Sequence, residues 1–289
     1  RLFENSLVKL LKITKKKSGF DNIVLSGGAA MNCVMNGKLD KLKLYKDSHI
    51  SFAPDDSGVS IGAGLLTYYK KTNKVRKVYE IKANYFGPEF STNEIKKIIS
   101  SYKLKYSYKE NIEYISAKLL AEGKIIGWFQ GKMEFGHRAL GNRSILGDPR
   151  NYKNKDKINK MIKFRESFRP FAPAVLEEYK NKIFEMPKNR KVYFMERAYK
   201  FKKNWYSKVP SVVHVDGTGR LQTVNKKNNL RFYNLIKEFH KITNVPIVLN
   251  TSFNLNGEPI VMTPYDAIRT FFTSGLDYLI IDNFIISKK

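Results

Sequence analysis

Cysteine, acidic residues and long apolar runs are all scarce in this sequence of 289 residues. The single cysteine, Cys33, excludes an intramolecular disulfide framework and a metal site built from several cysteines, and it favours a reducing, cytoplasmic location. No run of eighteen or more apolar residues occurs, so we expect no membrane-spanning helix. The first residues lack a methionine and the layout of a signal peptide, and we expect a fragment of a longer chain.

The shortage of acidic residues leaves a formal net charge of +27, from 53 basic and 26 acidic side chains. Such a charge could attract a nucleic acid. However, 41 of the basic residues are lysine and 12 are arginine, whereas base recognition and paired phosphate contacts favour arginine. The lysines are scattered, as A/T-biased coding produces without any partner. We therefore favour a compositional bias over a nucleic-acid surface.

The chain is 42% hydrophobic, enough to bury a sizeable core in one large or two modest domains. In its first part a glycine turn follows one short strand and an acidic turn follows the next, as at the end of an α/β domain with parallel strands. Residues 73–83 are expected to be a linker. The elements expected before it are helices over 2–17, 29–42 and 58–69, and strands at 22–25 and 50–52.

The remaining residues, 85–289, predict a mixed α/β domain of about two hundred residues. Ser91 and Glu94 form the pattern of a capping box at the start of a helix. The helices expected here are 91–101, 112–122, 152–162, 229–243 and 264–274. The expected strands are 102–108, 124–129, 172–176, 211–215, 220–224, 246–249 and 278–281. The fold class is therefore α/β.

Two short turns in the first part could carry chemistry. Gly27 and Gly28 stand between a strand and a helix, where the backbone can approach an anion, although a bare glycine pair is more often a structural turn. Asp56 follows the next strand and could bind a metal or a hydroxyl, or could cap the following helix. On spacing alone we favour the structural turn and the helix cap.

The densest polar segment runs from Gln130 to Ser144. It follows an expected buried strand and contains three glycines, which a solvated basic loop would not need. Its hydrogen-bond donors are Lys132, Arg138, Arg143 and Ser144.

A second basic segment, residues 163–171, alternates charged and aromatic side chains. In an extended segment this alternation would send Lys163, Arg165 and Arg169 to one face. Converging guanidinium groups bind phosphate or carboxylate through paired hydrogen bonds. Because five of the twelve arginines lie between residues 138 and 169, we favour an anion pocket over a solvated strand.

Two more segments, Asn250–Asn254 and His214–Thr218, could be either binding sites or ordinary turns. The four histidines show no metal-ligand spacing, and a lone histidine is more often structural.

Five separated segments together resemble the O-carbamoyltransferases of the nodulation-factor, cephamycin and tobramycin type. They follow the family's order over nearly the whole chain. The segments are residues 27–32, 131–144, 163–173, 214–218 and 249–254.

The resemblance implies an actin-like ATPase-superfold domain followed by a domain similar to the threonylcarbamoyl-adenylate synthase. Residues 1–80 would then be the C-terminal piece of the first domain, and residues 85–289 the second. The second domain would convert carbamoyl phosphate and ATP into a carbamoyl-adenylate. The first, with iron, magnesium or a similar divalent metal, would pass the carbamoyl group to a hydroxyl of a sugar-like or natural-product acceptor.

The resemblance also implies roles for individual residues. Lys163, Arg165 and Arg138 would be catalytic, because they would neutralise carbamoyl phosphate and the nucleotide phosphates. Asp56 would be the last metal ligand, with the family's histidine ligands in a missing N-terminal part, and His137 receives no role. The residues that would bind the cofactor are Arg143, Ser144, Asn250, Ser252, Gly27, Gly28 and Asn32.

Two other functions stay open. One is a tRNA-modifying protein of the threonylcarbamoyl-adenylate type, and the other is a non-catalytic, basic nucleic-acid-binding domain. For the favoured function we expect two partners, the hydroxyl acceptor and the missing N-terminal segment of the same protein. An oligomer is possible, and the acceptor's identity is left open.

Overall fold

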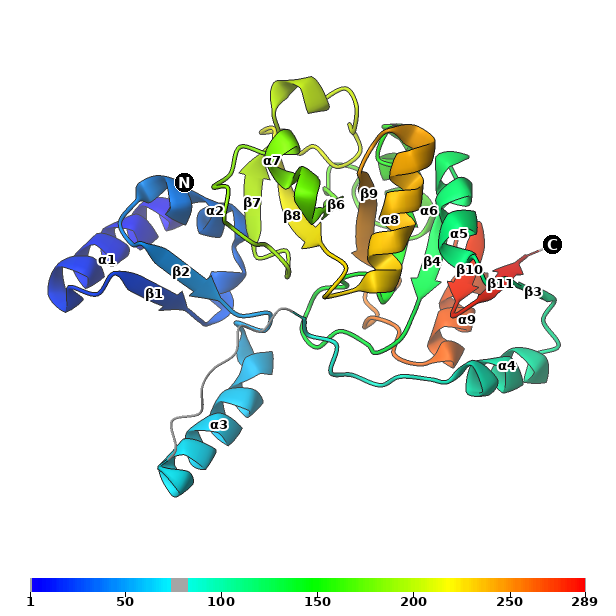
Figure 1. Ribbon diagram of the computed structural model, residues 1–289, viewed down its shortest axis with the longest axis horizontal. Helices are drawn as coiled ribbons and strands as arrows, with labels where there is room; N and C mark the ends of the chain where they lie inside the picture. Colours follow the sequence, from blue (N-terminus) through cyan, green and yellow to red (C-terminus); the bar gives the residue numbers. More distant parts are fainter. Residues whose placement is uncertain (1, 74–82, 289) are drawn as a thin grey trace.

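The computed structural model describes residues 2–73 and 83–288, in which the strands form a two-stranded and a nine-stranded sheet (Figure 1). The small sheet belongs to residues 2–73, called here the N-terminal part, and the large sheet to residues 83–288, called the main part. The mixed α/β class is thereby confirmed. Of the expected linker at 73–83, residues 74–82 lie outside the described residues. No helix of the described chain has the length and apolar character needed to cross a bilayer.

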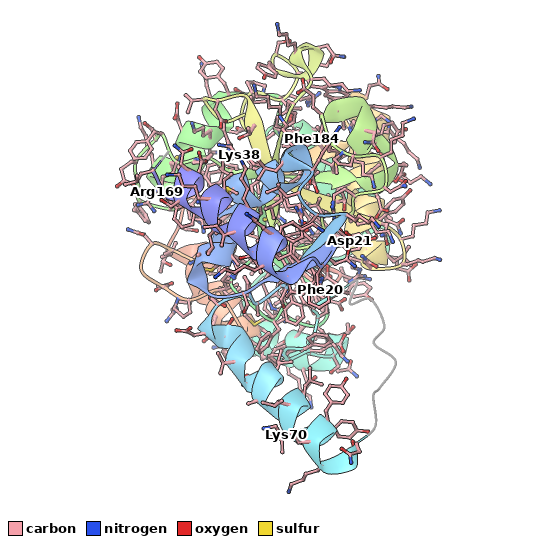
Figure 2. All side chains as sticks on the ribbon, turned by 90° about the vertical axis from the view of Figure 1, so that its left-hand side faces the viewer. Phe20, Asp21, Lys38, Lys70, Arg169 and Phe184 are labelled. Carbon is pink, nitrogen blue, oxygen red and sulfur yellow. The ribbon has the colours of Figure 1, made fainter. Side chains whose placement is uncertain are left out.

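The N-terminal part pairs its two strands in parallel, as the order of its turns predicted. Its small core is built around Leu11, Met35 and Ile50. The last helix has no buried residue and projects from the body, with Lys70 near its far end (Figure 2). The elements are α1 (Leu2–Ser18), β1 (Asn22–Leu25), α2 (Cys33–Leu42), β2 (Asp47–Ile50) and α3 (Val59–Thr72).

The expected helix over 29–42 is split at Asn32. Residues Gly28–Met31 form a single 3₁₀ turn, and α2 begins only at Cys33. The side chain of Asn32 accepts a hydrogen bond from the backbone N–H of Met35 at 3.0 Å. Asn32 is therefore the N-cap of α2, a position that asparagine favours.

The large sheet has the strand order β3-β11-β10-β4-β5-β9-β6-β8-β7 and mixes parallel with antiparallel pairs. Every residue of β4 is buried, so both faces of the sheet are covered at its centre. The strands are β3 (Tyr106–Tyr108), β4 (Ile126–Phe129), β5 (Arg143–Gly147), β6 (Ala172–Leu176), β7 (Arg197–Lys200), β8 (Thr218–Val224), β9 (Ile247–Ser252), β10 (Tyr278–Ile281) and β11 (Phe284–Ser287).

Helices α5 and α8 pack side by side over the sheet, whereas α9 packs against β10 and β4 (Figure 1). The capping box predicted at Ser91 and Glu94 is confirmed, with both reciprocal hydrogen bonds formed. The helices of the main part are α4 (Thr92–Ser101), α5 (Ile112–Ala121), α6 (Lys153–Met161), α7 (Lys180–Ile183), α8 (Leu230–Thr243) and α9 (Pro264–Phe272).

The strand expected at 211–215 is wrong. The backbone turns there twice, because Val212 N–H donates to the carbonyl of Val209 and Gly217 N–H donates to that of His214. Conversely, strands β5, β7 and β11 were not expected from the sequence.

Candidate functional site

A cavity of about 390 Å³ opens where the start of α2 meets the main part. Four arginines and two histidines line it, and no aspartate or glutamate is among its lining residues in the described chain. We call it the arginine cavity. Its charged and polar lining residues are His137, Arg138, Arg165, Arg169, His214, Arg220, Asn250, Thr251 and Ser252.

The sheet and its loops bring these side chains together from distant parts of the sequence. Arg220 comes from β8, and residues Asn250–Ser252 come from the end of β9. Strand β6 lies between these two strands. Arg138 comes from the loop between β4 and β5, while Arg165 and Arg169 come from the loop between α6 and β6.

Arg138 and Arg220 form the cationic centre of the cavity. Within the described residues neither guanidinium has a hydrogen bond or an ion pair, and the Nε atoms of both are buried without a partner. Burial, followed by the charge of the nearby Arg220, lowers the pKa of Arg138 to about 10. Burial likewise lowers the pKa of Arg220. Both side chains still carry their charge at neutral pH, so their guanidinium N–H groups can donate hydrogen bonds to an anion.

Arg165 is held in the wall of the cavity. Its Nε donates to Oδ1 of Asn159 at 2.8 Å, and its guanidinium lies 4.9 Å from the ring centroid of Phe171. Arg169 is more exposed and pairs with Glu166 at 2.8 Å. Both arginines line the cavity together with Arg138, whereas Lys163, which was expected on the same face, and Arg143 and Arg150 are not among its lining residues.

The extended geometry predicted for residues 163–169 is wrong. Phe164 adopts a left-handed backbone with φ of 44°, and the segment turns, with Arg169 N–H donating to the carbonyl of Glu166. The segment therefore does not present alternate side chains to one face, and Lys163 is not among the residues that line the cavity.

Lys163 is bound to the turn after β9 and does not line the cavity. Its Nζ lies 2.6 Å from the main-chain oxygen of Ser252 and 2.6 Å from Oδ1 of Asn254. The main-chain oxygen of Asn254 lies 3.0 Å away. Burial, followed by the charge of Arg165, lowers the pKa of Lys163 to about 7. The geometry makes Lys163 a support for the turn that carries Ser252.

Asn250 is fully buried and lines the cavity. Its Nδ2 donates to the carbonyl of Ala139 and to Oε1 of Gln222, whose own Nε2 donates to the carbonyl of Leu140. This chain of donors fixes the orientation of the Asn250 amide. Its Oδ1 is left buried without a partner among the described residues.

The segment 214–218 forms a tight turn that begins at His214, and His214 is the residue of this segment that lines the cavity. Its Nδ1 lies 3.2 Å from Oγ1 of Thr218, and Oγ1 of Thr218 donates to Asp216 at 2.7 Å. Burial is the main cause that lowers the pKa of His214. Burial also lowers the pKa of His137 to about 4. Both imidazoles are therefore neutral at pH 7.

Arg143 and Ser144, predicted to bind nucleotide, are not among the residues that line the cavity. The guanidinium of Arg143 donates to the carbonyls of Gln130, Asn142 and Pro88 and lies 3.6 Å from the ring centroid of Phe129. Ser144 accepts from the N–H of Gly141 at 3.0 Å. The structure thus places both residues in the packing of the loop that carries Arg138.

Gly27, Gly28, Asn32 and Asp56 also lie outside the lining of the cavity. Gly27 has φ of 89°, and a Cβ at Gly27 or Gly28 would meet open space. The two residues after the Asn32 cap, Cys33 and Val34, do line the cavity. The N-terminal part therefore contributes the first turn of α2 to the site, and burial raises the pKa of the Cys33 thiol.

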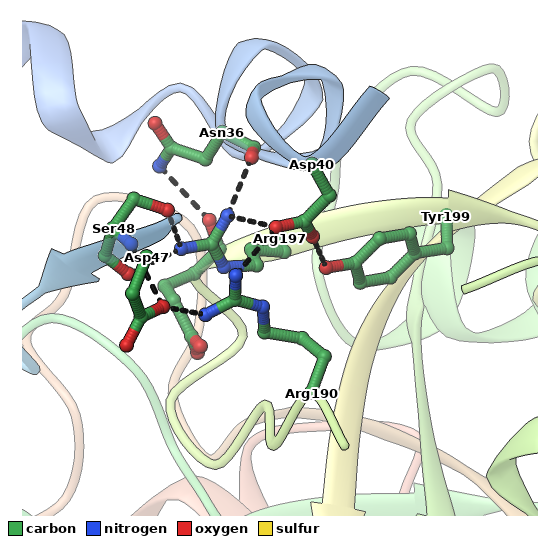
Figure 3. A network of polar contacts seen from close by, with 8 residues as sticks. Asn36, Asp40, Asp47, Ser48, Arg190, Arg197 and Tyr199 are labelled. Carbon is green, nitrogen blue, oxygen red and sulfur yellow. Dashed lines mark hydrogen bonds and ion pairs between the residues drawn. The ribbon is translucent and has the colours of Figure 1, made fainter. Parts of the chain in front are cut away.

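A buried polar network fixes α2 against the main part (Figure 3). Arg197 donates to the carbonyls of Asn36 and Ser48 at 2.7 and 2.8 Å. Arg190 pairs with Asp40 at 2.7 Å and with Asp47 at 2.5 Å, and the hydroxyl of Tyr199 donates to Asp40. Because these bonds hold α2, they also hold Cys33 and Val34 at the cavity.

Sequence reasoning did not assign a role to Arg220 or Cys33. Arg220 lies inside an expected strand, 220–224, and a strand position alone indicates no site. The sequence does contain a signal for Arg220. It is one of only twelve arginines in a lysine-rich chain, and it stands two residues after Thr218, the end of the candidate segment 214–218.

The chain is similar to known proteins over nearly its whole length. Residues 117–288 match the family model described as carbamoyltransferase C-terminus, and residues 1–65 match the one described as carbamoyltransferase N-terminus.

The chain is 39% identical over 290 residues to nodulation protein NolO of Bradyrhizobium diazoefficiens, covering 99% of this chain and 53% of that protein. It is 39% identical to nodulation protein NolNO of Sinorhizobium fredii, covering 99% of this chain and 42% of that protein. It is also 39% identical over 294 residues to an uncharacterized protein of Methanocaldococcus jannaschii, covering all of this chain and 48% of that protein. The chain spans about half the length of these curated relatives.

Proposed function

The chain belongs to the carbamoyltransferase family, and from this membership and the arginine cavity we propose that the cavity binds carbamoyl phosphate for ATP-dependent activation. The product would be a carbamoyl-adenylate, from which the carbamoyl group passes to a hydroxyl of a sugar-like or natural-product acceptor. The single observation that carries the proposal is a cavity lined by four arginines and no carboxylate, with two of the guanidiniums unpaired in the described chain.

The electrostatics of the cavity support an acyl phosphate ligand. Arg138 and Arg220 are charged and partly desolvated, and their mutual repulsion is relieved when a dianion lies between them. Arg165 and Arg169 add donors on another wall. As the acyl phosphate reacts, charge builds up on its phosphate oxygens, and guanidinium groups fixed beforehand stabilise that charge.

The volume of the cavity suits a small-molecule ligand. A cavity of about 390 Å³ falls in the usual range of about 300 to 1,000 Å³ for small-molecule sites. The balanced reaction consumes carbamoyl phosphate, ATP and one water, and it yields carbamoyl-adenylate, phosphate and pyrophosphate. Transfer of the carbamoyl group to a hydroxyl then releases AMP.

The finer domain assignment is part of the same proposal. We infer that residues 1–80 belong to an actin-like carbamoyl-transfer domain and that residues 85–289 form the adenylate-forming domain. The parallel pairing of β1 and β2 supports the first assignment, and the arginine cavity supports the second.

A metal at Asp56 is not supported by a ligand set in this chain. No group of three or more histidine, cysteine, aspartate or glutamate residues that could hold a metal ion occurs in residues 2–73 and 83–288. A metal at Asp56 would need ligands from outside the described residues, so we route no step through a metal.

Exchange of pyrophosphate into ATP tests the proposal. We expect the purified chain to catalyse the exchange with carbamoyl phosphate and not with threonine plus bicarbonate, and Arg165→Ala should abolish it while leaving the circular dichroism spectrum unchanged. Exchange with threonine plus bicarbonate would favour a tRNA-modifying protein instead. Strong, salt-dependent RNA binding without exchange would favour a nucleic-acid-binding domain.

A further inference from the structure

The buried side-chain atoms of the arginine cavity that have no partner in the described chain include Nε2 of His214 and Oδ1 of Asn250, and both can accept a hydrogen bond. A phosphate group, which mainly accepts hydrogen bonds from the guanidiniums, leaves both of them unused. Unpaired buried acceptors cost free energy, so their presence beside a ligand cavity points to donors on the ligand.

The orientation of each acceptor follows from its neighbours. Oγ1 of Thr218 has one proton and donates it to Asp216 at 2.7 Å, so it can only accept from Nδ1 of His214 at 3.2 Å. The proton of the neutral ring therefore sits on Nδ1, and Nε2 keeps its lone pair. The side chain of Asn250 is oriented by its own donor group. Its Nδ2 already donates to Ala139 and Gln222, so Oδ1 is the atom left to accept a hydrogen bond.

The charge state of His214 agrees with a hydrogen-bond acceptor at Nε2. The charged groups that act on it are Asp216, Arg220 and Lys155, and the carbonyl of Phe171 also faces the ring. Burial dominates and lowers the pKa of the imidazole, so the ring is neutral at pH 7. With the single ring proton on Nδ1, Nε2 accepts rather than donates.

We propose that Nε2 of His214, with Oδ1 of Asn250, accepts hydrogen bonds from the –NH₂ of the carbamoyl group and so selects carbamoyl over acetyl phosphate. This inference rests on the proposed function and adds the basis of acyl specificity. The carbamoyl –NH₂ offers two N–H donors, whereas the methyl of an acetyl group offers none and leaves both acceptors buried and unpaired. A site built in this way discriminates strongly against an isostere that lacks the donor.

Two stable analogues separate the roles of the acyl and phosphate groups. Phosphonoacetamide carries the amide –NH₂, and 2-oxopropylphosphonate carries a methyl in its place. By isothermal titration calorimetry at pH 7.5, we expect the intact chain to bind phosphonoacetamide at least about tenfold more tightly, the value of one hydrogen bond with a buried partner.

Three variants test the assignment of His214. His214→Phe, which keeps a ring of similar shape, should lower this preference by about tenfold through weaker binding of phosphonoacetamide alone. Thr218→Val should also lower it, because the tautomer is then no longer fixed, whereas Thr218→Ser should retain it. His49→Phe is the matched control, since His49 is exposed and outside the cavity, and it should keep the full preference.

The outcomes separate this inference from the proposed function. If the intact chain binds both analogues equally, the specificity assignment is overturned while phosphate binding stands. Equal weakening of both analogues in His214→Phe would overturn it as well, because the ring would then serve the phosphate or the fold. If the folded chain binds neither the analogues nor carbamoyl phosphate, the proposed function fails and the inference falls with it.

Discussion

Lys163 donates a hydrogen bond to Oδ1 of Asn254 across 91 positions of the sequence, at a distance of 2.6 Å. The same ammonium contacts the carbonyl of Ser252, a residue that lines the arginine cavity. The resemblance would place Lys163 on the phosphates of the ligands, whereas its contacts place it against the end of β9 and the turn that follows, outside the cavity lining. Lys163 is thus a positioning residue in this structure.

Replacing Lys163 tests this position. Lys163→Met should lower the free energy of unfolding by about 1 to 3 kcal/mol, because several buried oxygens lose their charged donor. It should also weaken phosphonoacetamide binding, through a turn that is no longer held. Urea denaturation and calorimetry measure both effects, with Lys160→Met on the exposed side of α6 as the control. A variant that keeps its stability and loses binding entirely would favour direct contact with the ligand.

The cationic centre of the cavity predicts opposite effects on stability and binding. Arg220→Met removes a desolvated charge that has no partner in the described chain, so the free protein should be more stable by about 1 kcal/mol. Affinity for carbamoyl phosphate should fall by about 30- to 100-fold, because a charge-assisted hydrogen bond contributes about 2 to 3 kcal/mol. Thermal unfolding with and without ligand measures both quantities.

Arg269→Gln is the matched control for Arg220, because Arg269 lies on α9 and is not among the cavity residues. It should change neither quantity. A loss of stability in Arg220→Met would mean that Arg220 has a structural partner after all.

The elements that could be predicted from the sequence are those whose cause is local. The capping box at Ser91 and Glu94 needs only a spacing of three residues. Strands β4 and β10 are short apolar runs, and such runs predict buried strands. Strand β5 was not predicted, because polar residues such as Arg143 and Ser144 are typical of a loop. Both are buried only through pairing with β4 and β9, which the local sequence does not reveal.

The candidate site could be predicted in part for the same reason. The local concentration of arginine identified Arg138, Arg165 and Arg169, which the structure places around one cavity. Arg220 joins them only because the sheet order places β8 two strands from β9. The position of Lys163 depends on a turn some ninety residues later, and alternation within its own segment could not show it.

The contact between α2 and β7 predicts a steric effect at Gly37. A Cβ at this position would lie 2.0 Å from the carbonyl oxygen of Ala198, so the two backbones must separate. Gly37→Ala should cost more than about 2 kcal/mol of stability. It should also weaken ligand binding, because Cys33 and Val34 begin the same helix.

Gly64→Ala is the matched control for Gly37→Ala. Gly64 also lies in a helix, but a Cβ there would meet open space. Alanine should therefore raise the stability of α3 by about 0.5 to 1 kcal/mol. If both alanine variants behave alike, α2 does not pack on β7 as described.

Glu196 gives the stability of the chain a specific pH dependence. Burial raises its pKa from 4.5 to about 6, although it accepts a hydrogen bond from the N–H of Phe194. Because the folded chain holds this proton more tightly than the unfolded chain, the contribution of Glu196 to stability is greatest below pH 4.5. It falls as the pH rises through 6.

Glu196→Gln removes the ionisation and can keep the hydrogen bond to Phe194. The variant should therefore be more stable than the parent by about 1 to 2 kcal/mol at pH 7.5 and equal to it near pH 4.5. Urea titrations at both pH values measure the difference, and a variant that is less stable at pH 7.5 would show that the carboxylate is stabilised by its charge.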